Sequence, residues 1–235
     1  MKAILIVILF FSFTLNAFGQ IDSGITNKAE AKNLKVNGKK EGKWMEYIDD
    51  AEKIAKDSNK ARYYHLAVYK SGKLNGFVRD YEKNGQLHSI GLYINDKENG
   101  YFTFYDSGRV VLSIPYVNGK VTGVAKFYSL SGDSTDLGMF EIPYIDGQRN
   151  GVEKAYYKNG KIMWEDTVNN GKKQGIDIAY YESGKEKGEE SWRNGKREGM
   201  GKEYYEDGKI KSETFYKNGK EGATKKYDKY GNEIK

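Results

Sequence analysis

The 235-residue sequence contains no cysteine, only two prolines and only two histidines. Without cysteine, the chain can form no disulfide, carry no lipidated cysteine and use no thiolate nucleophile. The histidines, His65 and His88, are isolated from each other, and no nucleophile elbow, phosphate-binding loop or His-Glu-x-x-His pair occurs. We therefore predict that the protein is not an enzyme, has no catalytic or metal-binding residues and uses no cofactor.

Long apolar segments are also absent after the first 19 residues. Residues 1–19 resemble a signal peptide, with Lys2 before an apolar run from Ala3 to Phe13 and small residues at Ala17 and Gly19. The run is shorter than the ~20 residues of a membrane-spanning helix, which favours cleavage over an uncleaved anchor. We predict an exported protein, periplasmic or extracellular, with an N-terminal linker over residues 20–34 and a repeat domain over residues 35–235.

A concentrated charge of one sign is the third feature that the sequence lacks. The formal net charge is +6, but basic and acidic side chains are interspersed along the chain. Nucleic-acid binding requires clustered cations, and binding to anionic lipid requires a basic cluster or an amphipathic helix. We predict neither a nucleic acid nor a membrane lipid as partner.

A repeat is the dominant positive feature of the chain. A glycine recurs at intervals of 23 to 34 residues at the end of a motif close to x-Asn-Gly-Lys-x-x-Gly, and a tyrosine stands five residues after each copy. We call these eight residues the repeat glycines, and each defines one unit: Gly42, Gly76, Gly100, Gly123, Gly151, Gly175, Gly199 and Gly222. The tyrosines are Tyr47, Tyr81, Tyr105, Tyr128, Tyr156, Tyr180, Tyr204 and Tyr227.

Each unit carries two turn signals around segments of strand length. Asn159-Gly160 and Asn194-Gly195 are examples of dipeptides that tolerate the positive φ angles of tight hairpin turns. The intervening segments are rich in Tyr, Phe, Val, Ile and Thr, and no helix-length amphipathic segment is available to cover a sheet. We predict an all-β fold: an elongated, twisted single-layer antiparallel sheet of about eight tandem β-hairpin repeats, with stacked tyrosines whose hydroxyls lie in water.

The segment from Trp192 to Tyr204 resembles a MORN (membrane occupation and recognition nexus) repeat, and the Tyr-Tyr-x-x-Gly-Lys turns at 156–161, 180–185 and 204–209 resemble the bacterial MORN-repeat variant. The resemblance extends over about residues 35–235. It implies an elongated antiparallel sheet that acts as a scaffold or binding surface. Some proteins of the variant group are described as antitoxins of toxin–antitoxin pairs, which for an exported chain implies a secreted toxin as the target.

Two insertions interrupt the repeat, one near residues 49–61 and one near residues 131–137. Insertions in repeat proteins form loops on one face and can carry binding residues, although a longer hairpin loop is the simpler interpretation. Neither the second insertion nor the segment from Asn95 to Gly100 completes the oxygen-ligand pattern of a calcium loop.

The aromatic residues are the candidate binding face. They comprise the tyrosines of the repeat and a second set near the following turn, which suit an interface because they offer large, stiff contact area. The candidates are Tyr81, Tyr105, Tyr128, Tyr156, Tyr180, Tyr204, Tyr227, Tyr93, Tyr116, Tyr144, Trp192 and Tyr216. A purely structural role for the same rings is the competing interpretation, because a single-layer sheet needs cross-strand aromatic pairs.

These features of the sequence favour three functions. The leading hypothesis is a protein–protein interaction or envelope-scaffold module. The first alternative is carbohydrate or cell-wall binding, with Trp192 and Trp164 placed to stack on sugar, and the second is an antitoxin-like partner of a secreted toxin. We also expect that the last strand leaves an open sheet edge, through which the protein could form a homodimer.

Overall fold

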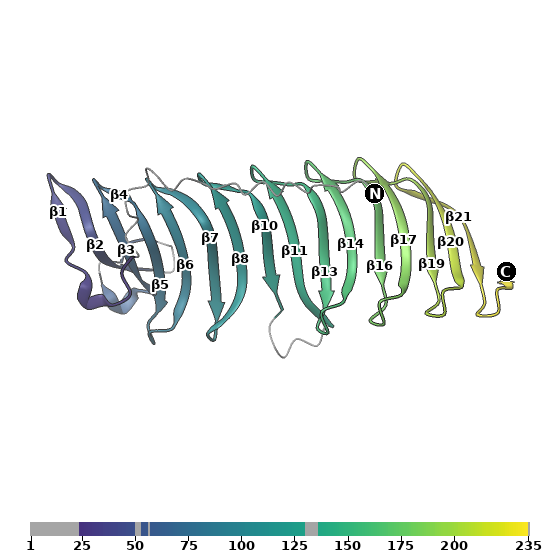
Figure 1. Ribbon diagram of the computed structural model, residues 1–235, viewed down its shortest axis with the longest axis horizontal. Helices are drawn as coiled ribbons and strands as arrows, with labels where there is room; N and C mark the ends of the chain where they lie inside the picture. The colour runs from purple at the N-terminus through teal and green to yellow at the C-terminus, as the bar shows by residue number, and fades with distance from the viewer. Residues whose placement is uncertain (1–23, 50–52, 56, 130–135, 235) are drawn as a thin grey trace, which may run out of the picture.

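The computed structural model describes residues 24–49, 53–55, 57–129 and 136–234. The predicted signal peptide and parts of both insertions lie outside these residues. The described chain forms one long, curved antiparallel sheet in which successive strands follow one another from end to end (Figure 1). The predicted all-β, single-layer fold of tandem hairpins is confirmed.

The described elements are two short 3-10 helices and 22 strand segments. The helices are η1 (Lys28–Glu30) and η2 (Ser58–Lys60). The strands are β1 (Leu34–Val36), β2 (Lys39–Ile48), β3 (Tyr63–Lys70), β4 (Lys73–Leu74), β5 (Gly76–Glu82), β6 (Leu87–Ile94), β7 (Lys97–Asp106), β8 (Arg109–Val117), β9 (Lys120–Val121), β10 (Gly123–Tyr128), β11 (Leu137–Ile145), β12 (Gln148–Arg149), β13 (Gly151–Tyr157), β14 (Ile162–Asn169), β15 (Lys172–Lys173), β16 (Gly175–Tyr180), β17 (Glu186–Arg193), β18 (Lys196–Arg197), β19 (Gly199–Tyr204), β20 (Ile210–Lys217), β21 (Lys220–Tyr227) and β22 (Glu233–Ile234).

The two turns of a unit have different geometries. The turn that precedes each repeat glycine has two residues with positive φ, as at Asn194 (51°) and Gly195 (77°), which is the type I′ hairpin turn. In five units the other turn is a three-residue loop that closes on a positive-φ glycine, whereas in the third unit Ser107 and Gly108 form a two-residue turn between β7 and β8. In the three-residue loop, for example, Gly160 N donates to Tyr157 O and Tyr157 N donates to Lys161 O. Both turns form because Asn and Gly adopt positive φ at little cost.

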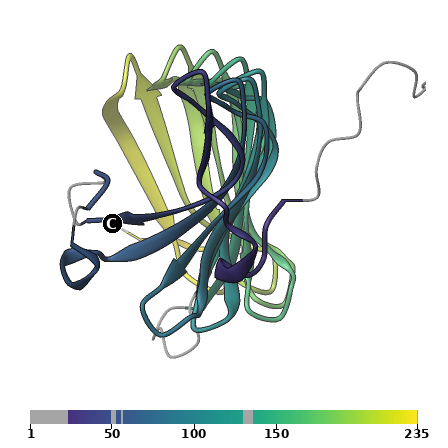
Figure 2. The same ribbon diagram turned by 90° about the vertical axis from the view of Figure 1, so that its left-hand side faces the viewer.

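The repeat glycines bend the strands. Seven of the eight have positive φ, from 68° at Gly100 to 148° at Gly76, and several follow a one-residue break in the ladder, as between β4 and β5. An extra residue with a left-handed glycine is a β-bulge, which kinks its strand and increases the local twist. The sheet is consequently a trough when it is viewed along its long axis (Figure 2).

The trough has two unlike faces. We call the concave face the inner face; it carries the residues at even offsets from the repeat glycines, such as Trp44, Val78, Ala125 and Ala155, which are 7%, 4%, 1% and 0% exposed. The convex outer face carries the odd offsets. There the first residue after the repeat glycine is exposed, as at Ile176 (52%). Curvature therefore buries side chains without a second layer.

Residues 24–33, within the segment 20–34 predicted as a linker, pack against the first units of the sheet. Ile25 is 0% exposed and packs on Leu66 and Val68, while Arg79 Nη1 donates to the Ile25 carbonyl at 3.2 Å. Lys28 places its ammonium 3.5 Å from the centre of the Tyr64 ring. The segment covers the outer face of the first two units, where it closes an apolar core.

The N-terminal edge of the sheet is covered. Strand β1 pairs with the first part of β2, and the Asn33 side chain then bonds both main-chain groups of Met45, at 2.8 and 3.1 Å. Ala55, in the first insertion, donates its main-chain N–H to Tyr47 at 2.7 Å. The insertion thus protects an edge that could otherwise pair with another chain.

At the other end, β22 pairs with β21 at Lys226 and Tyr227. Dimerisation through this edge stays a prediction. The part of the chain that the structure describes contains no helix that is long and apolar enough to cross a membrane.

Candidate functional site

The tyrosines of the repeat tie neighbouring units together on the outer face. Tyr156 donates its hydroxyl to Glu141 at 2.8 Å, and the same bond recurs with nearly the same sequence separation in the following units. The further pairs are Tyr180 with Glu165 (3.0 Å), Tyr204 with Glu189 (3.0 Å) and Tyr227 with Glu213 (3.1 Å). These hydroxyls bond to carboxylates rather than to water alone, which corrects the expectation that they lie in water.

Lysines complete this ladder. Lys126 approaches Glu141 at 2.9 Å, and Lys202 approaches Glu189 at 3.1 Å. The lysine bond holds the pKa of Glu141 below its usual range, and burial together with the glutamate raises the pKa of Tyr156 to about 12. The ladder stays fixed at neutral pH as a tyrosine–carboxylate–lysine chain, and its hydroxyls are occupied in holding units together.

The second aromatic set lies on the opposite, inner face. Tyr93, Tyr116, Tyr144, Trp192 and Tyr216 pair directly across the strands from the repeat glycines Gly76, Gly100, Gly123, Gly175 and Gly199. A ring beside a glycine shields main chain that has no side chain of its own. Burial raises the pKa of Tyr93 to about 12. The twelve predicted residues therefore form two separate sets on two faces.

Trp192, predicted to stack on sugar, is covered by cations. The Lys173 ammonium lies 4.9 Å from the ring centre, and the Arg197 guanidinium lies 5.5 Å from it. Its indole N–H is buried. A sugar ring could not stack there without displacing both side chains.

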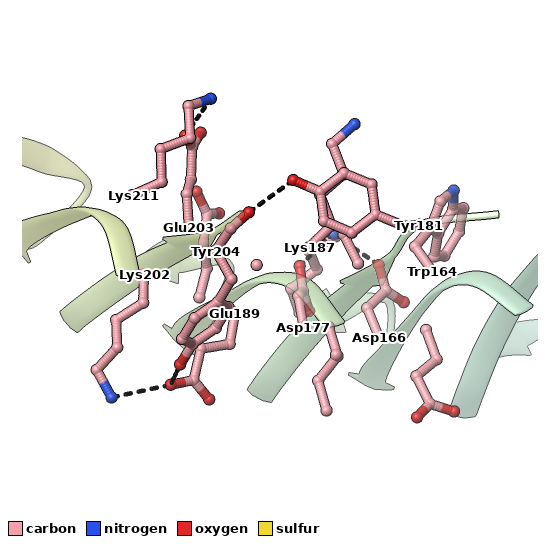
Figure 3. A pocket seen from close by; sticks show the side chains of 16 residues that line it. Trp164, Asp166, Asp177, Tyr181, Lys187, Glu189, Lys202, Glu203, Tyr204 and Lys211 are labelled. Atoms are coloured by element: carbon pink, nitrogen blue, oxygen red, sulfur yellow. Dashed lines mark hydrogen bonds and ion pairs between the residues drawn. The ribbon is translucent and has the colours of Figure 1, made fainter. Parts of the chain in front are cut away.

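Trp164 is placed differently, because it separates two hollows of the inner face. One hollow of about 460 Å³ is lined by apolar side chains that include Phe127, Phe140 and Ile142, with the Phe140 and Trp164 ring centres 5.9 Å apart. The other, of about 440 Å³, contains Asp166, Asp177 and Glu190 (Figure 3). We call the two hollows together the inner furrow. The apolar hollow borders the second insertion, whose residues 130–135 lie outside the described part.

The floor of the acidic hollow is made of small residues. Ala179 and Gly188 pair with each other across β16 and β17, and they leave main chain accessible beside Trp164. Tyr181 borders another side of the hollow, where its hydroxyl donates to the Tyr204 carbonyl at 2.6 Å (Figure 3). Trp164 and Tyr181 thus form aromatic walls on two sides of the hollow, and main-chain groups beside Ala179 and Gly188 form its polar floor.

Four carboxylates lie side by side along one wall of the inner furrow. Glu153 pairs with Asp166 across β13 and β14, and Asp177 pairs with Glu190 across β16 and β17. Glu153 and Asp166 are only 4% and 3% exposed. Directly opposed like charges destabilise a sheet. The inner face therefore carries unfavourable charge pairs, whereas the carboxylates of the outer face pair with tyrosines and lysines.

Three cations partly neutralise the row. Lys173 bridges Asp166 and Asp177 at 2.6 Å each, Arg149 lies 3.4 Å from Glu153, and Arg197 lies 2.8 Å from Glu190. Burial raises the pKa of Glu153 and of Asp177 despite these cations. Oxygens Glu153 Oε1, Asp166 Oδ1 and Asp177 Oδ1 are buried without a hydrogen-bond donor.

This row of carboxylates was not predicted from the sequence. Carboxylates that are adjacent in sequence, such as Glu189 and Glu190 on β17, lie on opposite faces of the sheet and do not form the row. The missed signal was the pairing across each hairpin, which brings Glu153 opposite Asp166. Within the described residues no group of three or more His, Asp or Glu side chains has the arrangement of a metal site.

The outer face offers a second exposed surface. Residues immediately after successive repeat glycines form an apolar row, with exposed fractions between 36% and 58%. The row comprises Tyr101, Val124, Val152, Ile176 and Met200. In the second unit the equivalent residue, Phe77, lies beneath Gly24 of the N-terminal segment.

This architecture defines a class: an open, single-layer sheet of tandem hairpin repeats with two unlike faces. Residues 149–172 and 197–218 match the family model of the MORN repeat variant, which confirms the resemblance over two repeats. Repeats of this family are typically non-catalytic and generally mediate binding. No curated protein matches the chain.

Proposed function

We propose that the protein is an exported protein–protein interaction module that binds its partner in the inner furrow. The observation that carries the proposal is Trp164, a partly exposed ring between an apolar and an acidic hollow. Aromatic anchors beside well-formed hollows contribute most of the binding energy at protein interfaces. The tyrosine ladder and the rings opposite glycines are occupied in holding the sheet.

Affinity capture from the envelope and medium of the producing cell tests the proposal, with protein from Gln20 onward as bait. A protein retained by the wild type should be lost on Trp164→Ala and kept on Ile176→Ala, a matched variant in the outer row. Circular dichroism should show that both variants are folded. A partner lost on Ile176→Ala and kept on Trp164→Ala would place binding on the outer face and contradict the proposal.

Carbohydrate binding is supported by one specific observation. Trp164 and Tyr181 border a hollow whose rim carries carboxylates and the amines of Lys187 and Lys211, a combination that can stack on a sugar and bond its hydroxyls (Figure 3). Retention of polysaccharide alone, lost on Trp164→Ala, would favour this alternative. An antitoxin-like role would be a special case of protein binding, with a secreted toxin in the furrow.

A further inference from the structure

The inner furrow combines two unlike environments within reach of one short ligand. Its apolar hollow is centred near β11 and β13, and its acidic hollow is centred near β16 and β17. These centres are about three strand spacings apart, or about 14 Å, which an extended chain spans in about four residues. One peptide could therefore place a side chain in each hollow.

Two carboxylate oxygens of the acidic hollow lack a hydrogen-bond donor. Asp166 is 3% exposed, yet its Oδ1 has no donor, and the same holds for Oδ1 of Asp177 beside it. Lys173 bonds only the other oxygen of each carboxylate. Buried carboxylate oxygens without donors are costly, and charge-assisted donors satisfy them best.

The remaining cations near this hollow are engaged elsewhere. Lys211 pairs with Glu203 at 3.2 Å, and the Lys187 ammonium lies 5.9 Å from the centre of the Tyr181 ring. Arg197 bonds Glu190 and packs on Trp192. In the row of Glu153, Asp166, Asp177 and Glu190, four carboxylates face three cations, so the row retains a negative excess.

We infer that the ligand of the inner furrow is an extended peptide segment with a lysine or arginine beside Trp164 and a bulky apolar side chain about four residues away. The cationic group would donate to the carboxylates of the acidic hollow, and its alkyl stem would lie against the Trp164 ring. The apolar side chain would fill the hollow between Phe127, Phe140 and Ile142. This inference rests on the proposed function and names the partner's chemistry.

A displayed library of random heptapeptides tests the inference with the folded protein from Gln20 onward as target. We expect enriched sequences to carry Lys or Arg about four residues from an aromatic or large aliphatic residue. A synthetic peptide from that pool should bind at least tenfold more weakly when Gln replaces its basic residue. The Asp177→Asn/Glu190→Gln variant of the protein should bind the basic peptide more weakly by a similar factor.

The matched control is Glu182→Gln/Glu206→Gln, which changes the net charge equally at exposed turns and should leave affinity unchanged. Peptides that need Trp164 but show no preference for a basic residue would overturn the inference and leave the proposed function standing. Failure to enrich any peptide, with retention of glycans, would overturn both. Equal weakening by the control variant would also contradict the inference, because it would show long-range charge attraction only.

Discussion

Glu153 is the least favourably placed charge on the inner face, so we expect Glu153→Gln to stabilise the protein. The side chain is 5% exposed, lies directly opposite Asp166, and has one buried oxygen without a donor. Burial raises its pKa, and Asp166 raises it further, while Arg149 only partly opposes the shift. The amide introduced by the substitution is neutral and carries N–H donors, so we expect it to donate to the carboxylate of Asp166, its cross-strand neighbour.

The size of the gain follows from three contributions. Removing directly opposed like charges is worth up to about 1 kcal/mol, and satisfying a buried polar atom is worth about 1–3 kcal/mol. Loss of the Arg149 ion pair, whose guanidinium is 44% exposed, costs up to about 1 kcal/mol. A net gain of about 1 kcal/mol should raise the unfolding midpoint of a sheet of this size by about 2–4 °C.

The gain should depend on pH with a defined sign. Because the folded state raises the pKa of Glu153, ionisation of this group costs stability at neutral pH, and the cost disappears as pH falls below the usual range of a glutamate. The advantage of Glu153→Gln should therefore be full at pH 7–8 and vanish near pH 4.

Asp80→Asn should have the opposite effect and destabilise the protein. Burial alone would raise the pKa of Asp80, but the hydrogen bonds from His65 (2.7 Å) and Ser89 (2.6 Å) outweigh burial and lower it. This variant should lose about 1–3 kcal/mol at neutral pH, and the loss should shrink in acid. Thermal unfolding of both variants, followed by circular dichroism from pH 4 to 8, measures the gain on Glu153→Gln and the loss on Asp80→Asn. A Glu153→Gln variant that is less stable than wild type at pH 7.5 would refute the reasoning.

Three further predictions concern the segments that hold the sheet. Ile25→Ala should cost about 2–4 kcal/mol in urea unfolding, since Ile25 is fully buried, whereas Ile176→Ala, at a 52% exposed site, should cost less than about 0.5 kcal/mol. Tyr180→Phe should cost about 1 kcal/mol through loss of its bond to Glu165, while Tyr128→Phe, with no hydroxyl bond in the described chain, should be near neutral. Light scattering should detect a concentration-dependent dimer if the edge at β21 pairs, and monomers at every concentration would count against that pairing.

The repeat and its hairpins were predictable because the signals are local. Asn-Gly at positive φ forms a type I′ turn regardless of distant contacts. The position of this turn then determines which residues of the two strands pair. Strand composition and the lack of helical periodicity then excluded a second layer. Gly175 and its equivalents end the sequence motif of the turn, but the structure uses them as bulges within or at the start of strands, in most units four residues after the second positive-φ residue of the turn.

The candidate site was less predictable because it depends on pairing across hairpins. Tyr180 and Trp192 looked like members of one aromatic surface, but Trp192 pairs with Gly175, an odd number of residues before Tyr180, so the two rings face opposite ways. The N-terminal segment was missed for another reason. Ile25 packs on Leu66 and Val68, which lie more than 40 residues away in the sequence. No local sequence pattern predicts such a contact.

The two faces divide the tasks of this sheet. On the outer face, charges are matched: each glutamate of the ladder has a tyrosine donor, and Glu141 and Glu189 also have lysines. On the inner face of the same units, carboxylates oppose carboxylates and leave acceptor oxygens unsatisfied. A fold selected for stability alone would place neutral residues there, as the equivalent positions Val78 and Ala125 show. Unmatched charge at the acidic hollow, on a sheet already held by its other face, therefore supports the proposed binding site in the inner furrow.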